Sequence, residues 1–332
     1  MDNSQVEDAF RVIDASIAEI KWKLRPSSKN RLVFDILALI TGLRPAVMVD
    51  YGGHGSELQA HLCILLDLIK KQSSLFELLR VMIIEDMIYL IHIRGLAEHA
   101  LASLCLKREI LFVDIDKDPP KMLLQKDGQV VSAQLESIQK MLFSLLCVHK
   151  LNKDLLADIP PFLGIGPPEK VLVEQSGYQK DPANEFSGPI DLSSLMQDSQ
   201  VTLPTLNGYM TKLIFAAWSN ALLECCISRW LLGYPVAYLF TKDHVADAIS
   251  NLSSKPLHLY MILVCRNVVS KKDNFQELMS FTVPCELSMR GDDEQWAKAF
   301  MVDMSSKLER CKQVWRHLKL EVRECYPQSI VL

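Results

Sequence analysis

The residues with the clearest capacity for chemistry follow a short apolar run near the start of the chain. Residues 47–51 read Val-Met-Val-Asp-Tyr, which predicts a strand buried on both faces. Three glycines follow within four residues: Gly52, Gly53 and Gly55. Glycine lets a backbone come close to a ligand or take a left-handed turn. The segment therefore predicts either a small-molecule site beside Asp50 or a tight exit from a buried strand.

The first alternative resembles the first motif of methyltransferases that use S-adenosylmethionine. The resemblance implies that Asp50, Gly52, Gly53 and Gly55 form the cofactor loop and that Glu85 or Asp86 holds the ribose hydroxyls. Two features oppose it. The strand ending at Glu85 turns straight into another strand, whereas a doubly wound sheet needs a helical crossover there. The gap from Gly55 to Glu85 also exceeds the usual spacing of about twenty residues. A plain strand-to-helix turn is favoured.

A second candidate is the run Phe112-Val113-Asp114-Ile115-Asp116. An apolar strand ending in Asp-x-Asp resembles the nucleophile motif of haloacid-dehalogenase-type phosphatases, in which paired carboxylates hold magnesium and attack phosphate. That family has Thr or Val two residues past the second Asp, where this chain has Asp118 followed by two prolines. A solvated, acid-rich strand exit is the favoured interpretation, and no cofactor or metal is predicted here.

The remaining reactive residue types form no recognisable constellation. His54 and His61, and likewise His92 and His99, are seven residues apart, but a predicted element boundary falls between the members of each pair. The chain has no Gly-x-Ser-x-Gly and no phosphate-binding Gly-Lys-Ser/Thr sequence. Nine cysteines are scattered, and the adjacent pair at 225 and 226 points in directions about 100° apart on a helix. The cysteines are therefore expected to be reduced and buried in a cytoplasmic or nuclear protein.

Hydrophobic periodicity predicts the elements that position these residues. The predicted helices cover residues 4–24, 29–41, 56–69, 94–104, 132–148, 208–232, 243–251 and 293–321. The predicted strands cover residues 47–51, 81–84, 88–93, 110–115, 236–240, 257–265 and 277–283, and the second and third of these form a hairpin. The final helix carries Trp296, Phe300, Met304, Leu308, Trp315 and Leu318 on one stripe, which indicates a core-facing surface or an interface for a partner.

These elements predict an α/β fold with a mixed, mostly buried sheet flanked by helices. Residues 1–150 and 206–332 form two α/β halves packed as one globular unit. Residues 151–205 are rich in proline and glycine and form a linker or surface excursion. The order helix–strand–helix–strand–strand–helix occurs in both halves, so two pseudo-repeated lobes are a further hypothesis. A chance echo of a common helix-stop signal is the favoured explanation.

Composition excludes some classes of function. The net charge is −4 and no long basic block occurs, which argues against nucleic-acid binding. The polar, acidic first residues do not resemble a signal peptide. The longest apolar stretch, 213–240, is interrupted by Asn220, Glu224 and Arg229, so a core helix followed by a strand is expected rather than membrane insertion.

Segments from both halves also resemble an uncharacterised eukaryotic protein family, a domain of unknown function typified by an open-reading-frame product of human chromosome one. The resemblance rests on residues 43–50, 112–115, 231–238 and 280–284, and would cover residues 30–300. It implies no activity and no catalytic residues. The missing catalytic constellations, the 13 glycines in 332 residues and the aromatic last helix favour a non-catalytic module that binds protein partners. The alternative is a methyltransferase-like enzyme or small-molecule binder that uses the loop after Asp50.

Overall fold

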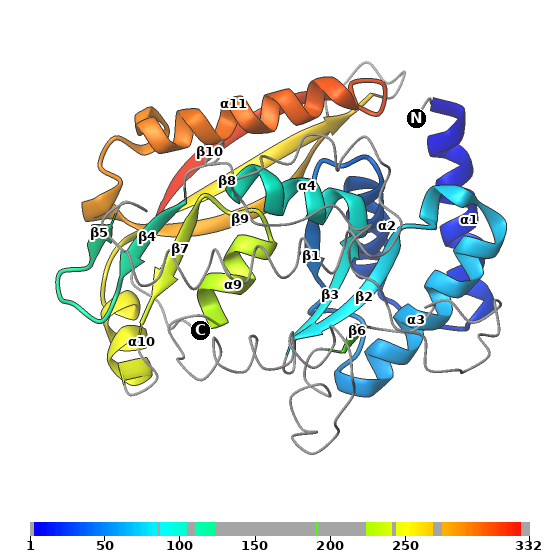
Figure 1. The fold of residues 1–332 in the computed structure, drawn as a ribbon, viewed down its shortest axis with the longest axis horizontal. Coiled ribbons are helices and arrows are strands. Elements are labelled where there is room, and N and C mark those ends of the chain that lie inside the picture. The colour runs from blue at the N-terminus through cyan, green and yellow to red at the C-terminus, as the bar shows by residue number, and fades with distance from the viewer. Residues whose placement is uncertain are drawn as a thin grey trace, which may run out of the picture.

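The computed structural model describes residues 3–84, 87–104, 110–123, 190–191, 224–240, 244–267 and 274–326. Together these segments form an α/β fold, with helices packed around three small sheets (Figure 1). The elements of the first part are α1 (Asn3–Glu19), α2 (Pro26–Ile40), β1 (Ala46–Met48), α3 (Gly55–Gln72), β2 (Leu79–Ile84), β3 (Met87–His92), α4 (Ile93–Leu104), β4 (Leu111–Asp114) and β5 (Lys121–Leu123).

The later elements begin with a two-residue strand in the region predicted as a linker. They are β6 (Ile190–Asp191), α9 (Glu224–Leu231), β7 (Val236–Leu239), α10 (Val245–Ser253), β8 (Leu257–Arg266), β9 (Phe275–Pro284), α11 (Gln295–Arg310) and β10 (Trp315–Cys325). The predicted helix 132–148, most of the linker 151–205 and the first part of the helix 208–232 lie outside the described residues.

The predicted last helix, 293–321, is wrong in its second half. Helix α11 ends at Arg310, and the amides of Val314 and Trp315 both donate to the carbonyl of Cys311, which turns the chain. Strand β10 then pairs antiparallel with β8 along its whole length. Side chains alternate from there: Leu318, Leu320 and Val322 pack against the core, and the residues between them are more polar.

The predicted single sheet is divided into three. The strand orders are β1-β3-β2-β6, β10-β8-β9 and β5-β4-β7. The predicted hairpin is present, with β2 and β3 antiparallel from Leu79↔His92 to Ile84↔Met87. Two parallel pairings join segments distant in the chain, β2 with β6 and β4 with β7. One hydrophobic core contains residues of α1, α2, α3, α10 and α11 and of strands from all three sheets.

Helix α2 lies at the centre of this core. Its residues 32–39 are all buried, so it has no solvent-facing side over two turns. In the middle of the helix, the ring of Phe34 meets the ring of Trp315 edge-on, with centroids 5.2 Å apart. The Trp315 indole also donates to the hydroxyl of Thr41, the C-cap residue of α2, at 3.0 Å. The N-terminal half and the β10-β8-β9 sheet are therefore packed around the same helix.

The predicted repeat of element order recurs in the described elements, but strand pairing differs between the two sets. The series α2-β1-α3-β2-β3-α4 is matched by α9-β7-α10-β8-β9-α11. In the first, β1 pairs antiparallel with β3, whereas β7 pairs parallel with β4 and not with β9. The pseudo-repeated lobes are therefore not confirmed.

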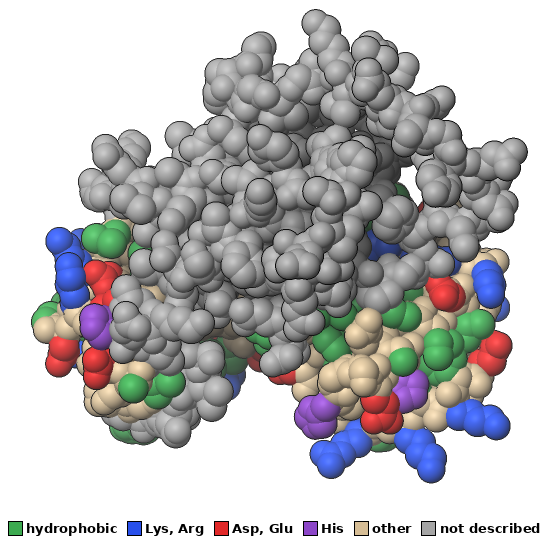
Figure 2. Space-filling model, turned by 60° about the horizontal axis from the view of Figure 1, so that its bottom comes forward, with side chains coloured by type: hydrophobic (Ala, Val, Ile, Leu, Met, Phe, Trp, Pro, Cys, Tyr) green, Lys and Arg blue, Asp and Glu red, His purple; other side chains and the backbone are tan. Residues whose placement is uncertain are grey.

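The described surface and the helix lengths concern two kinds of partner, nucleic acids and membranes. In Figure 2 the visible described surface carries basic and acidic side chains close together, without a continuous basic face. None of the helices within the described ranges is both long and apolar enough to cross a membrane.

Candidate functional site

The loop after β1 has a backbone that only glycine adopts easily. Gly52, Gly53 and Gly55 have φ values of +86°, +144° and +51°, in the region that side chains disfavour. Asp50 is exposed at the start of the loop. Helix α3 begins directly at Gly55, with His54 as its N-cap residue and no side-chain capping bond. The helix therefore begins one residue before the predicted start at 56, and the glycines form a tight connection.

Side chains of the segment between α1 and α2 occupy one side of this loop. The Trp22 indole Nε1 donates to the Gly52 carbonyl oxygen at 2.7 Å, and the Trp22 ring stacks on His61 of α3 with centroids 5.1 Å apart. A Cβ atom at Gly52 would lie 2.5 Å from Leu24 Cδ2 and 3.1 Å from Trp22 Cζ2. The close approach at Gly52 is therefore an approach to the protein's own side chains.

The sheet topology around β1 differs from the one that the methyltransferase resemblance implies. Strand β3 lies between β1 and β2, so β1 has an antiparallel neighbour where the methyltransferase resemblance implies a parallel one. The two acids at 85 and 86 connect β2 to β3 and lie outside the described residues. The structure therefore shows the candidate residues Asp50, Gly52, Gly53 and Gly55 together, and does not describe Glu85 or Asp86.

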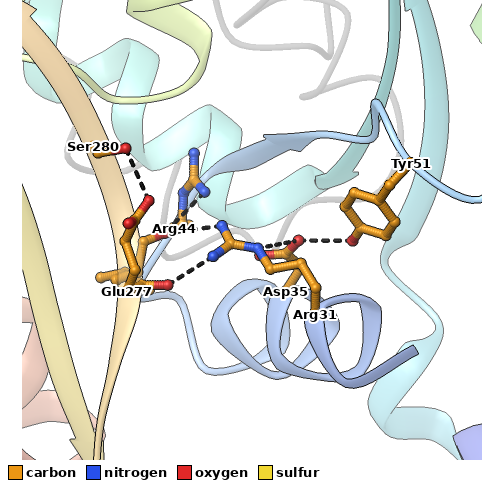
Figure 3. Close-up of polar contacts among 7 residues, drawn as sticks. Arg31, Asp35, Arg44, Tyr51, Glu277 and Ser280 are labelled. Carbon is orange, nitrogen blue, oxygen red and sulfur yellow. Dashed lines mark hydrogen bonds and ion pairs between the residues drawn. The ribbon is translucent and has the colours of Figure 1, made fainter. Parts of the chain in front are cut away.

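A buried ion pair beside this loop was not predicted from the sequence. The carboxylate of Asp35, on α2, is 1% exposed. It accepts from Arg31 Nε at 3.1 Å and from the Tyr51 hydroxyl at 2.8 Å, both on Oδ2. Figure 3 shows Arg31 between Asp35 and the backbone of Glu277 on β9, with Tyr51 on the opposite side. The signal that could have identified it is a charged residue inside the apolar run 32–39, with an arginine four positions before it.

The guanidinium groups of this network bind the outer edge of β9. Met279 pairs with Ile262 and Glu277 with Leu263, so Leu278 is an extra residue in the register, as in a β-bulge. Arg31 donates to the carbonyls of Glu277, at 2.7 Å, and of Leu278, at 3.4 Å. Arg44, itself 3% exposed, donates to the Leu278 carbonyl at 3.1 Å. These arginines therefore satisfy edge carbonyls that no strand of the described residues pairs with.

Burial dominates the ionisation of this network. Desolvation raises the pKa of Asp35, although Arg31 and Arg44 lower it in part. Desolvation also raises the pKa of Tyr51, and the neighbouring Asp35 raises it further. A tyrosine in this state remains a hydrogen-bond donor and is not available as a base. The network thus has the features of a structural ion pair.

The acid-rich exit of β4 is engaged in local contacts. Lys255 lies 2.7 Å from Asp118 and 3.3 Å from Glu286, and His244 lies 3.7 Å from Asp116. The amide of Asp116 donates to Asp114 Oδ1 at 3.2 Å. No group of three or more potential ligands within the described residues could hold a metal ion. The geometry matches a solvated strand exit whose charges are matched by neighbours.

The histidines and cysteines are dispersed. Nδ1 of His92 accepts from the Gly95 amide at 3.1 Å, and Nε2 of His99 lies 2.7 Å from the Trp230 carbonyl. Burial, and to a lesser degree Arg94, lowers the pKa of His92 to about 4. The free thiols within the described residues are Cys63, Cys265, Cys285, Cys311 and Cys325.

The aromatic stripe of the last helix faces inward. Phe300, Met304 and Leu308 of α11 are buried in the core. The ring centroid of Trp296 lies 4.9 Å from that of Tyr260 on β8. This confirms the core-facing interpretation of that stripe and leaves little of it for a partner.

The two edges of the β10-β8-β9 sheet differ in their exposure. At β9, Tyr238 of β7 donates to the Thr282 carbonyl at 2.7 Å, in addition to the two arginines at Glu277 and Leu278. At the opposite edge, no strand of the described residues pairs with the outer side of β10. We call this side the β10 edge. His317, Lys319 and Arg323 are exposed along it.

The fold and these contacts define an α/β protein in which Gly52 packs against Trp22 and Leu24. The family comparison agrees with the sequence resemblance. Residues 14–213 and 217–332 match the family model described as Domain of unknown function (DUF4504), and the chain belongs to that family. No curated protein and no solved structure matches the chain.

A substitution at Gly52 tests whether the loop is packed against Trp22 and Leu24. Gly52→Ala should destabilise the protein by more than Gly42→Ala. Both glycines have a similar positive φ, +86° and +74°, which costs a side chain about 1–2 kcal/mol. Only at Gly52 would the added Cβ atom meet other atoms within 4 Å, and such overpacking adds about 1–3 kcal/mol to the loss of stability. Urea unfolding measures both, and equal losses would contradict the packing described.

A double-mutant cycle tests the buried ion pair. Arg31→Met should lower the free energy of unfolding by about 2–4 kcal/mol, because the Asp35 carboxylate keeps its burial and loses its nearest counter-charge. Adding Asp35→Asn to that variant should recover part of the loss, since it removes the buried charge. Chemical unfolding of the four proteins gives the coupling energy. Strictly additive effects would show that the two side chains do not interact.

The pKa of His92 predicts a dependence of stability on pH. Between its unfolded value of 6.5 and its native value of about 4, the unfolded chain binds the proton and the native protein does not. The contribution of neutral His92 to the free energy of unfolding is therefore fully present above pH 6.5. It is lost as the pH is lowered towards 4, by about 2–3 kcal/mol. His92→Asn keeps an acceptor near the Gly95 amide but does not titrate. Between pH 7 and 4, the free energy of unfolding of the wild type should fall by this amount more than that of the variant. If the two proteins show the same dependence on pH, the lowered pKa of His92 is refuted.

Proposed function

We propose that this chain is a non-catalytic protein-interaction module that binds through the β10 edge. The observation that carries the proposal is the asymmetry of the β10-β8-β9 sheet. One edge is closed by Arg31, Arg44 and Tyr238, and the other is an eleven-residue strand with an open side among the described residues. An unpaired strand offers a row of backbone donors and acceptors, and extended segments of other chains bind such rows by strand addition.

The side chains of β10 support this use of the edge. Leu318, Leu320 and Val322 are only partly buried although they pack against the core, so a further strand would complete their burial. The strand is anchored at its start by Trp315, which is fully buried against α2. A rigid, preformed strand binds a partner at a lower entropic cost than a segment that must first become ordered.

The polar residues with catalytic potential support a structural assignment instead. Asp35, Arg31 and Arg44 hold β9 against α2, and Gly52 packs on Trp22. The proposal therefore gives the loop after Asp50 the task of connecting β1 to α3. It includes no cofactor and no nucleic acid.

Photo-crosslinking tests the proposal directly. A benzophenone amino acid at the exposed position His317 of β10 should form adducts with a partner protein in a native extract, identified by mass spectrometry. The same amino acid at Lys71, exposed on α3, is the control and should form none of these adducts. The folded state of both variants is checked by thermal unfolding. Adducts that are equal at the two positions, or absent at both, would refute binding through the β10 edge.

A further inference from the structure

We infer that the β10 edge pairs with the β10 edge of a second copy of this chain, antiparallel and about a two-fold axis at Leu320. The inference rests on the proposed function and names the partner. Such a pairing is isologous and closed, so it yields a dimer and not a filament. It would join two three-stranded sheets into one of six strands and leave only the two β9 edges, which are closed by side chains in each copy.

The alternation of β10 restricts the possible registers. The apolar residues 318, 320 and 322 lie on the sheet face that carries Tyr260, Ile262 and Val264 of β8. In an antiparallel pair, opposite residues point to the same face, and a slip of one residue would place this row against charged residues. The two-fold axis must therefore pass through a residue and not between two residues.

Charge then selects one residue. With the axis at Leu320, Lys319 faces Glu321 of the other copy. Leu318 faces Val322 and Leu320 faces itself. With the axis at Lys319 or at Glu321, that residue would face its own like charge. With the axis at Val322, Glu321 would face Arg323, but the apolar Leu320 would face Glu324. Opposite charges across strands stabilise the pair and like charges oppose it, so the register at Leu320 is favoured.

The charged row is already ordered in the single chain. Glu321 accepts from Lys319 Nζ and from Arg323 Nη2, each at 2.8 Å, along the same face of the strand. These side chains therefore stand in a fixed order, with alternating sign, before any partner arrives. In the same register Arg323 faces His317 of the other copy.

Sedimentation equilibrium of the purified chain tests the inference. The wild type should be a dimer in equilibrium with monomer. Glu321→Lys places lysines opposite each other twice and should weaken the dimer at least about tenfold, or about 1.4 kcal/mol. The double variant Lys319→Glu with Glu321→Lys restores complementarity and should recover the dimer. Glu57→Lys, the same charge reversal at an exposed position of α3 away from the β10 edge, is the control and should not weaken the dimer.

A second measurement does not depend on those charges. Leu320→Cys should form a disulfide between the two introduced cysteines under mild oxidation, located by mass spectrometry, whereas Lys71→Cys should not. A chain that stays monomeric at all concentrations, or a swap variant that does not recover the dimer, overturns the second copy as partner. Adducts of His317 with other proteins would then still support the proposed function, and their absence as well would refute both.

Discussion

The position of the β10-β8-β9 sheet depends on one buried ionic contact. Residues 32–39 of helix α2 are all buried and include Asp35, so this carboxylate requires a cation and hydrogen-bond donors. Arg31 supplies both and also reaches the carbonyls of the bulge at Leu278. The bulge is what turns two successive carbonyls towards the same side. A regular strand would present only every second carbonyl to the helix, so the arginines would have fewer carbonyl acceptors within reach.

This contact also determines which edge of the sheet is closed. Side chains of α2, of the segment after it and of β7 together occupy the carbonyls of β9. Strand addition there would require breaking hydrogen bonds of Arg31 and of the buried Arg44, which leaves charges without partners. At β10 the exposed residues carry charges on long side chains, which can move aside at little cost. The same interaction that stabilises the fold therefore directs pairing to the opposite edge.

Local patterns predicted most of the elements, and the failures have physical reasons. The spacing from Leu308 to Trp315 and then to Leu318 also fits a helix, so the helix 293–321 was predicted through the turn at Cys311. The alternation of Leu318, Leu320 and Val322 with His317, Lys319 and Glu321 is the signal of the strand that was missed. The pair of Arg31 and Asp35 is four residues apart and visible in the sequence. The carbonyls on β9 that Arg31 binds lie more than 240 positions away. A local sequence pattern cannot predict a contact over that separation.

The helix ends that precede β1 and β7 meet in space. Gly42 and Gly233 both end a helix with a similar positive φ, +74° and +78°, and a Cβ atom at Gly233 would lie 3.5 Å from the ring of Pro45. Each turn delivers its chain into a buried strand, β1 or β7, and each strand then adopts a different pairing. Arg44 follows the first turn and Tyr238 the second, and both donate to β9. Two equivalent helix ends thus converge on one strand edge, at Leu278 and at Thr282, and hinder strand addition at both places.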